Sequence, residues 1–319
     1  MDSDRDAHDD TAGMSNLSGS EARFEEPASA AVEVEIAGRT HTGHVRTNNE
    51  DHYLAVRIER SLKTIETNLI DGSLPERFDD VAYGMLIADG MGGYAAGEVA
   101  SRLALVKLIE LAVETPDWVM RMQRRENADT FMRRMTERFR TIDSVIRSQA
   151  ESDPSLVGMG TTLTVAASLG AELFVGHIGD SRAYLFRNER LFQLTRDNTL
   201  AQELIDAGIA RAEDTATQAM RHVLTAALAA GEQSDPQVQR FRLADGDQIL
   251  LCTDGLTEMV KDETIAGVLN ETQSVATACQ ALIDLALASG GSDNATALLA
   301  RYRFPGATRN LRRDFLPST

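Results

Sequence analysis

Short apolar runs alternate along the chain with longer segments in which apolar residues recur at helical spacing. The short runs predict β-strands, because runs of about four to eight residues rich in branched and aromatic side chains are typical of strands. Val81–Ala88 and Gln248–Cys252 are apolar almost throughout, which indicates strands covered on both faces. The predicted strands are Val32–Ile36, His52–Val56, Val81–Ala88, Thr161–Ser168, Glu172–Ile178, Ala183–Phe186, Gln248–Cys252 and Ala295–Tyr302.

Three longer segments, Tyr94–Val113, Asp129–Ala150 and Ser274–Ala288, predict amphipathic helices. We interpret their apolar stripes as core-facing surfaces rather than as cofactor sites. Long helices after pairs of strands favour an α+β layered domain. The order lacks the regular β-α-β alternation of a nucleotide-binding fold, and no glycine-rich phosphate loop follows a first strand.

The chain divides into three parts by composition. Residues 1–31 are polar and acidic and lack apolar periodicity, which predicts a disordered acidic tail. Residues 32–304 predict one domain without internal repeats, and residues 305–319 a C-terminal tail. Residues 1–35 carry ten acidic and two basic side chains, so they account for −8 of the formal net charge of −17.

The acidic composition narrows the classes of partner. An acidic surface repels phosphate backbones and anionic lipids, so we expect no nucleic-acid and no membrane partner. No apolar run approaches the ~20 residues that cross a bilayer, and the first ten residues lack the pattern of a signal peptide. The simplest interpretation is a cytoplasmic protein.

An aspartate beside a strand end recurs five times, usually next to glycine. The five residues are Asp51, Asp89, Asp180, Asp254 and Asp293. One such aspartate is more often a turn residue or a helix cap than a ligand, but five in one chain change that balance. Clustered carboxylates beside apolar strands suffer desolvation and mutual repulsion, and a bound cation removes both costs.

Ligands that are all oxygen atoms favour Mg²⁺ or Mn²⁺. The six histidines show no His-x-x-x-His spacing and the two cysteines no Cys-x-x-Cys spacing, so a zinc site is disfavoured. Several shared carboxylates suit a two-metal centre, in which a bridging water becomes hydroxide and attacks phosphorus in line. Such metals would also reconcile an acidic protein with an anionic substrate.

Two further residue types bear on phosphate chemistry. The six residues after Cys252 include two acids and no arginine, so Cys252 lacks what a thiolate phosphate loop requires. We interpret Cys252 and Cys279 as packed core thiols. Arg46 offers a planar fork for two phosphate oxygens; the alternatives are a surface arginine or one that pairs with Glu50.

Six motifs, in order between residues 38 and 303, together resemble the metal-dependent protein phosphatases (PPM family, type 2C) in their compact bacterial form. They are Gly43–Asp51, Ala88–Gly93 with Ala96–Glu98, Gly158–Leu163, His177–Arg182, Asp247–Thr257 and Ser292–Thr296. The resemblance implies a four-layer α/β/β/α sandwich, with two antiparallel β-sheets flanked by helices and a metal centre at one end. It also implies hydrolysis of phosphoserine and phosphothreonine on proteins that Ser/Thr kinases phosphorylate, and we expect a monomer.

The resemblance assigns metal ligands residue by residue. Asp89 would bridge two Mn²⁺ or Mg²⁺ ions, and the Gly90 carbonyl would complete one of them. Asp254 and Asp293 would hold the second ion. Asp51 would act on the first ion, largely through bound water.

Other roles follow from the same motifs. Asp180, together with Asp254, would hold a third, weaker ion. Arg46 would bind the substrate phosphate, which makes Arg46 and Asp89 the implied catalytic residues. Glu50 and Asn294 would support the ligands.

Two positions depart from the family pattern. Met91 stands where some eukaryotic relatives carry a proposed general acid, so a metal-bound water is the expected proton source for the leaving group. Asn198 stands where the family usually has histidine. This position lies at the start of a flap over the cleft. We expect the flap over residues 199–230, with Gly208 as a hinge.

The chain is longer than compact family members over residues 57–80 and 114–127, which we interpret as surface elaborations; partner docking is the alternative. A non-catalytic scaffold that binds phosphoproteins is the alternative function. All predicted ligand positions keep their acids, which argues against it. A hydrolase of small phosphoesters is a third reading, which a comparison of rates on phosphopeptides and small esters would test.

Overall fold

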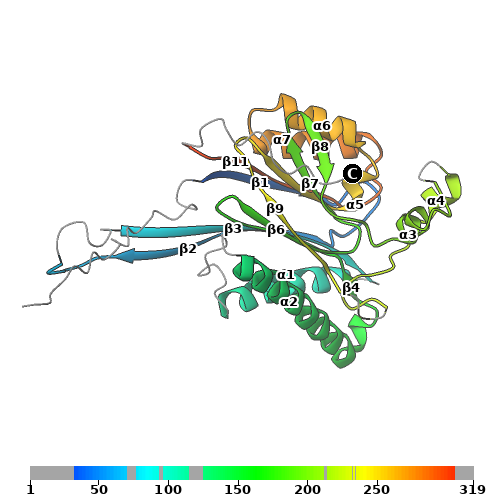
Figure 1. Ribbon diagram of the computed structural model, residues 1–319. Coiled ribbons are helices and arrows are strands. Elements are labelled where there is room, and N and C mark those ends of the chain that lie inside the picture. The colour runs from blue at the N-terminus through cyan, green and yellow to red at the C-terminus, as the bar shows by residue number, and fades with distance from the viewer. Residues whose placement is uncertain are drawn as a thin grey trace, which may run out of the picture.

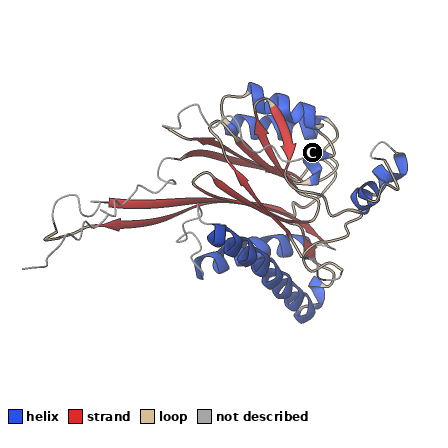
Figure 2. Ribbon diagram, in the orientation of Figure 1, coloured by secondary structure: helices blue, strands red, loops and turns tan. Residues whose placement is uncertain are grey.

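The computed structural model describes residues 32–69, 77–92, 96–114, 125–211, 214–231, 233 and 235–305. Two β-sheets pack face to face, and helices cover the outer face of each (Figures 1 and 2). This four-layer α/β/β/α sandwich confirms the predicted fold class. The two predicted tails lie almost wholly outside the described residues, so their boundaries stay predictions.

The first sheet has five antiparallel strands, with the N-terminal strand beside the C-terminal one. Its order is β1 (Glu33–His41), β11 (Ala295–Arg303), β10 (Gln248–Cys252), β7 (Arg182–Arg187) and β8 (Arg190–Gln193). Every residue of β10 is buried, because β10 is a central strand with a layer on each side.

The second sheet is also antiparallel and contains the longest strands. Its order is β2 (Asp51–Lys63), β3 (Arg77–Met91), β5 (Leu163–Leu169), β6 (Glu172–Ile178) and β9 (Gln237–Arg242), with the short β4 (Gly160–Thr161) paired to the end of β3. The far ends of β2 and β3 extend beyond the sandwich as a two-stranded ribbon (Figure 1).

Two pairs of helices form the outer layers. α1 (Ala96–Glu114) and α2 (Arg125–Ser152) cover the second sheet, and α6 (Asp262–Glu271) and α7 (Val275–Ala288) cover the first. The remaining helical pieces are Pro154–Leu156, α3 (Leu200–Asp206), α4 (Thr215–Ala219) and α5 (Asp254–Thr257). Among the described helices, none is both long and apolar enough to span a bilayer.

The central core lies between the two sheets. Met85 and Ile87 of β3 pack there with Leu251 and Tyr302 of the opposite sheet. The buried Tyr302 hydroxyl donates to Ser168 Oγ at 3.1 Å, so its polar atom is satisfied across the interface. Full burial of large apolar side chains stabilises a fold by about 1.5–3 kcal/mol each, so this layer fixes the positions of the strand ends.

The structure corrects several predicted boundaries. Glu172–Ile178 and Gln248–Cys252 are as predicted, but β2 and β3 include residues 57–63 and 77–80 of the first expected elaboration. Residues 70–76 of that elaboration and 115–124 of the second lie outside the described residues. The edge strands β8 and β9 and the helices α5 and α6 were not predicted, while α3 and α4 lie within the segment expected as the flap.

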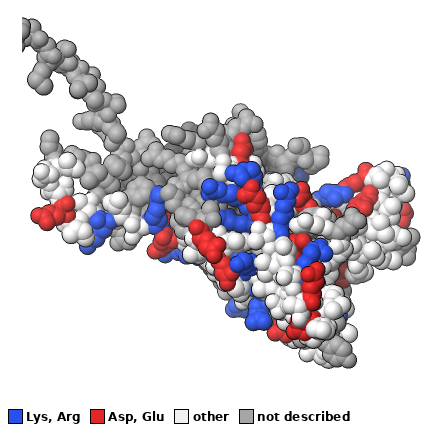
Figure 3. Space-filling model, turned by 90° about the horizontal axis from the view of Figure 1, so that it is seen from below, with Lys and Arg blue, Asp and Glu red and all other residues white. Residues whose placement is uncertain are grey.

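The surface seen from below Figure 1 carries both signs of charge (Figure 3). On α2, Arg133 pairs with Glu137 at 2.6 Å, and Arg140 pairs with Asp235 at 2.7 Å. Within the part of this face that the structure describes, basic side chains are interspersed with acidic ones. The described part of this face therefore shows no contiguous basic patch of the kind that binds a phosphate backbone.

Candidate metal centre and phosphate site

The five predicted aspartates gather at one end of the sandwich. Asp51 opens β2 and stands directly across from Asp89 near the end of β3. Asp180 follows β6, Asp254 opens α5 after β10, and Asp293 precedes β11. Burial raises the pKa of Asp89 well above its usual value, and the charges of the other four carboxylates add to the shift. Asp89 is therefore close enough to the other four for each of them to repel its charge.

Asp51 provides the clearest sign that a cation belongs here. Its Oδ2 accepts hydrogen bonds from the Thr253 hydroxyl at 2.8 Å and the Thr296 hydroxyl at 2.6 Å. Its Oδ1 is buried and has no hydrogen-bond partner. An unsatisfied buried acceptor costs about 1–3 kcal/mol, and burial raises the pKa of Asp51 to about 7 against the effect of the two hydroxyls. A cation beside Oδ1 would remove both penalties.

Gly90 fits a position where three backbone segments converge. Its amide donates to the Glu50 carbonyl at 3.2 Å. A Cβ atom at Gly90 would lie 2.1 Å from the Gly97 carbonyl oxygen and 2.9 Å from the Glu50 carbonyl oxygen. Gly97 is equally restricted, since a Cβ there would lie 2.9 Å from the Glu50 carboxylate. The end of β3, the loop before β2 and the start of α1 therefore meet in backbone contact.

Two threonines hold the backbone of Asp89 in place. The Thr162 amide donates to the Asp89 carbonyl at 2.9 Å, and the Asp89 amide donates to the Thr162 hydroxyl at 3.0 Å. The Thr161 hydroxyl also donates to the Asp89 carbonyl at 2.8 Å. The Thr162 and Ser181 hydroxyls are 2.8 Å apart, which joins this pair to the loop of Asp180.

Asn294 ties the loop of the first motif to the start of β11. Its Oδ1 accepts the Glu50 amide at 2.8 Å, and its Nδ2 donates to the carbonyls of Thr42 and Asn48, each at 2.9 Å. One side chain therefore binds three backbone groups of this loop. Asn294 thereby fixes the segment that carries Arg46 and leads into Asp51.

Arg46 lies at the rim of the carboxylate cluster. Its Nη2 donates to Asp293 Oδ2 at 2.7 Å, so its partner is Asp293 and not Glu50, the partner considered from sequence. The hydrogen bond to Asp293 raises the pKa of the guanidinium, and the charges of Asp89 and Glu50 add to that effect. The side chain is 55 % exposed, so part of the guanidinium fork faces solvent.

The loop that carries Asp180 is bound by Asn198, at the start of the predicted flap. The Asn198 side chain accepts the Gly179 amide at 2.9 Å, and the Asn198 amide donates to the Gly179 carbonyl at 2.7 Å. The Asn198 carbonyl accepts the Thr225 amide at 2.8 Å, so both ends of the segment meet at this residue. Gly208 has φ of +68° after α3, a conformation that favours glycine.

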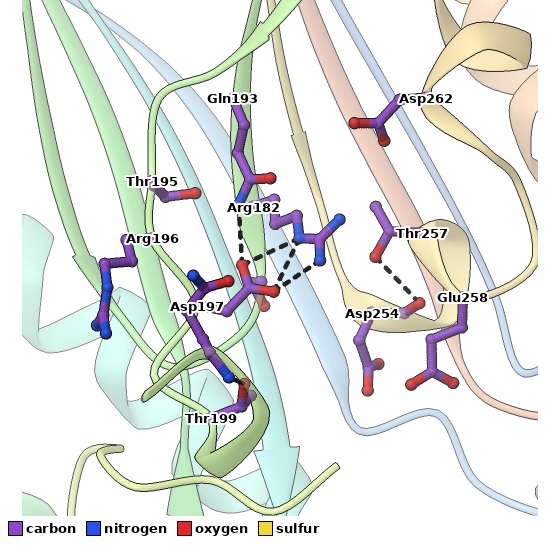
Figure 4. A network of polar contacts seen from close by, with 12 residues as sticks. Arg182, Gln193, Thr195, Arg196, Asp197, Thr199, Asp254, Thr257, Glu258 and Asp262 are labelled. Atoms are coloured by element: carbon purple, nitrogen blue, oxygen red, sulfur yellow. Dashed lines mark hydrogen bonds and ion pairs between the residues drawn. The ribbon is translucent and has the colours of Figure 1, made fainter. Parts of the chain in front are cut away.

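An ion pair anchors the same segment from the other side. Arg182 places its guanidinium fork on the Asp197 carboxylate, with nitrogen–oxygen distances of 3.0 and 2.6 Å, and Gln193 donates to the same carboxylate (Figure 4). Charge-assisted forked pairs of this kind are strong and directional. Sequence reasoning assigned no role to Asp197, which stands beside the flagged Asn198.

The structure also bears on the groups that sequence reasoning set aside. Cys252 and Cys279 are free and buried, and burial raises the pKa of both thiols. A thiol with a raised pKa is a poor nucleophile. Thr253, Thr296 and Thr162 lie inside the quoted motifs but were given no role, because their partners depend on which strands become neighbours.

The comparisons with known proteins agree with this geometry. A family model described as protein phosphatase 2C matches residues 76–288. The serine/threonine protein phosphatase PstP of Mycobacterium tuberculosis is 35 % identical over 274 residues, which cover 86 % of this chain and 46 % of PstP. The serine/threonine phosphatase Stp of Listeria welshimeri is 32 % identical over 263 residues, covering 82 % of this chain and 93 % of Stp.

A solved structure agrees with these sequence matches. The catalytic domain of PstP in complex with two manganese ions has a TM-score of 0.67 and 35 % identity, covering 85 % of this chain and 99 % of that one. The chain thus spans about half of the length of full PstP and nearly all of its catalytic domain. On the family match and the near-complete coverage of Stp, this chain belongs to the protein phosphatase 2C family.

Proposed function

We propose that this chain is a metal-dependent phosphatase that removes phosphate from phosphoserine and phosphothreonine on proteins. The observation that carries the proposal is the cluster of five buried or half-buried aspartates, one with an unsatisfied buried oxygen, beside a half-exposed arginine. The relatives named as serine/threonine phosphatases support it. An anionic site of this kind binds a phosphate ester only when cations neutralise it.

The donor set fits Mn²⁺ or Mg²⁺ as the cofactor. Asp89, with the Gly90 carbonyl and Asp51, would hold one ion, and Asp254 and Asp293 would share with Asp89 in holding the second. The described ligands of these two positions are oxygen atoms, which hard divalent cations prefer. Bound metals supply charge stabilisation at phosphorus and a nucleophile at neutral pH.

The protein's own groups position and neutralise the substrate. Arg46 can place two N–H donors on two phosphate oxygens, and its present partner Asp293 would then be satisfied by a cation. Thr253 and Thr296 keep one oxygen of Asp51 occupied, while its other oxygen is left without a hydrogen-bond partner and can bind a cation. Asn294 holds the Arg46 loop against β11, so phosphate binding does not have to order that loop.

We further propose that the substrates are proteins phosphorylated by Ser/Thr kinases, and that the chain acts as a monomer in the cytoplasm. Two free, buried cysteines are consistent with a reducing compartment. The competing scaffold hypothesis predicts loss of the metal-binding carboxylates. All five aspartates are present and lie at one end of the sandwich, which favours catalysis.

The test is phosphate release from a phosphothreonine peptide by the full chain, with Mn²⁺, with Mg²⁺ and with chelator. Wild type is compared with Asp89→Ala, Asp254→Ala and the control Asp284→Ala, which removes an exposed acid of α7. We expect metal-dependent turnover that falls by about 1,000-fold or more in the first two variants, since losing a metal ligand removes several kcal/mol. The control should match wild type.

A folded, metal-loaded wild type with no turnover on any phosphopeptide would overturn the proposal in favour of the scaffold. Faster turnover of a small phosphoester than of the peptide, compared as kcat/KM, would favour the small-ester reading instead. The peptide and the ester are therefore assayed side by side under the same metal conditions.

A further inference from the structure

A strained turn ends the expected flap segment, residues 199–230, where the chain returns to the sandwich. Ala229 has φ of +60°, in the left-handed region that a residue with a Cβ atom adopts only at a cost. Ala227 and Ala230 form an isolated β-bridge on either side of it. Such a conformation persists only where the surrounding structure holds it, so the contacts of this turn show what it is held against.

Asp143 of α2 holds the turn from one side. Its Oδ1 accepts the Ala229 amide at 2.7 Å, and its side chain is only 6 % exposed. Arg147, one helical turn further along α2, donates to the two carboxylate oxygens of Asp143 at 2.8 and 3.2 Å. Arg147 also donates to the Gly231 carbonyl at 3.1 Å. The pair therefore binds the backbone on both sides of Ala230.

Strand β4 holds the turn from the other side. The Leu228 amide donates to the Thr161 carbonyl at 2.9 Å, and the Thr161 amide donates to the Leu228 carbonyl at 3.0 Å. The Leu228 side chain is buried in the core beneath α1 and α2. Leu228 thus pairs with β4 as a neighbouring strand would, and the strained Ala229 is the next residue along the chain.

Thr161 connects the turn to two residues of the metal centre. It stands opposite Gly90 in the pairing of β3 with β4, and its hydroxyl donates to the Asp89 carbonyl at 2.8 Å. A Cβ atom at Gly160 would lie 3.0 Å from the Leu228 carbonyl oxygen, so the turn and β4 are in close contact. Consecutive hydrogen bonds therefore join the turn to the backbone of both ligands.

We propose that Asp143 is a positioning residue for the metal centre: it holds the strained turn against Thr161, which fixes the backbone of Asp89. The inference rests on the proposed function, in which Asp89 and Gly90 are metal ligands. Asp143 itself acts only through the turn. Sequence reasoning assigned it no role, since its partner Ala229 lies 86 residues further along the chain.

The choice of residues suits this role. Glycine would take the left-handed conformation without support, whereas alanine at position 229 makes the turn depend on its acceptor. A carboxylate is a stronger acceptor for an amide than a neutral oxygen is, and Arg147 fixes the orientation of that carboxylate. The geometry of the turn is therefore set from α2.

A purely structural contact between α2 and the turn makes a different prediction. Its loss would lower the stability of the whole domain, so the protection of all slowly exchanging amides would fall together. Loss of a positioning contact opens the turn locally. The central strand β10, which pairs on both sides with other strands, would then keep its protection while the metal ligands lose theirs.

The test measures amide hydrogen exchange of the metal-free full chain and its affinity for Mn²⁺ by equilibrium dialysis. In Asp143→Ala we expect faster exchange of the Thr161 and Leu228 amides relative to β10, and an affinity for Mn²⁺ about tenfold lower, as for other contacts that support metal ligands. Asp143→Asn keeps an oxygen for the Ala229 amide, so its affinity should exceed that of Asp143→Ala. The control Asp129→Ala removes an exposed acid of α2 and should match wild type.

Ala229→Gly provides a rescue that a nonspecific effect would not give. Glycine takes the left-handed conformation without Asp143. Adding Ala229→Gly to Asp143→Ala should therefore raise the affinity for Mn²⁺ by about fivefold or more, the factor that corresponds to the cost of left-handed alanine. The same double variant should slow exchange at Thr161 again.

Three results would overturn the proposal: wild-type affinity for Mn²⁺ in Asp143→Ala, no recovery on adding Ala229→Gly, or exchange that accelerates equally in β10 and at Thr161. If circular dichroism shows that Asp143→Ala does not fold, Thr161→Val tests the same path, since it removes the hydroxyl on the Asp89 carbonyl. Wild-type affinity in that variant would likewise reject the proposal. None of these measurements needs turnover, so they stand or fail separately from phosphatase activity.

Discussion

The two sides of the aspartate cluster are built differently. The sheet side, Asp51, Asp89 and Gly90, is fixed by cross-strand pairing and by backbone contacts that admit no Cβ atom. The flap side, Asp180 with Asn198 and His222, is held by a few hydrogen bonds to a segment that leaves the sandwich. We therefore propose that the sheet side sets the chemistry, while the flap side adjusts access and the third ion that the family resemblance implies.

Apart from removal of a metal ligand itself, the largest expected effect comes from Gly90→Ala on the sheet side. The new Cβ would overlap the Gly97 carbonyl, and overpacking of this kind costs about 1–3 kcal/mol. We expect a Tm lower by several degrees and kcat/KM lower by up to about 100-fold. The control is Gly267→Ala on α6, where a Cβ meets nothing within 4 Å and alanine favours the helix. Equal behaviour of the two variants would refute a rigid sheet side.

Arg46→Ala tests the rim between the two sides. Losing a hydrogen bond to a charged group costs about 1.5–3 kcal/mol, so we expect kcat/KM on a phosphothreonine peptide to fall about 10- to 100-fold. Arg46→Lys should recover part of the loss, since lysine keeps the charge but not the fork. Arg133→Ala, which removes another exposed paired arginine, serves as the control. An Arg46→Ala enzyme with wild-type kcat/KM would exclude phosphate binding by this residue.

The pH dependence of the metal-free protein measures repulsion on the sheet side. Burial raises the folded-state pKa of Asp51 to about 7, above the unfolded value of about 3.9. The folded state then binds more protons than the unfolded state between these values, so stability falls as pH rises from about 4 to about 7. We expect Tm in chelator to fall over this range, and Asp51→Asn to flatten the fall. A Tm that rises between pH 5 and 7 in chelator would contradict the assignment.

The smallest expected effect is on the flap side, from Asn198→Ala. It removes one hydrogen bond to Gly179 while keeping the backbone bonds of the same residue. A net cost of about 0.5–1.5 kcal/mol corresponds to an affinity for the third Mn²⁺ ion about 2- to 10-fold lower, with Tm nearly unchanged. Equilibrium dialysis and thermal unfolding measure the two quantities. A large fall in Tm would mean that the flap side is as structural as the sheet side.

The sequence predicts an element well when local interactions define that element, and less well when distant ones do. β10 was predicted to the residue because its apolar run has clear ends. β8 and β9 were missed because they are edge strands, in which polar residues such as Gln237, Gln239 and Arg240 interrupt the apolar pattern. Edge strands often carry charged residues that protect their unpaired edge, so their apolar signal is weaker.

The candidate site shows the same division. The gathering of the aspartates was predictable because each stands at a strand end, usually beside glycine. The hydrogen bonds to Asp51 were not predictable, since Thr253 and Thr296 reach Asp51 only when β10 and β11 are neighbours. The partner of Arg46 was missed for a similar reason, because Asn294 shapes the loop from far along the chain.

Strand β2 joins a buried and an exposed part of the molecule. It begins at the buried Asp51 and ends at Lys63, the last of its 13 residues, where no third strand pairs with the ribbon among the described residues. At about 3.4 Å per residue it spans roughly 40 Å. Amide hydrogen exchange should therefore be graded along this one strand, slow at the metal end and fast at the tip. Metal binding would slow exchange at one end only, so a single peptide segment contains its own internal reference.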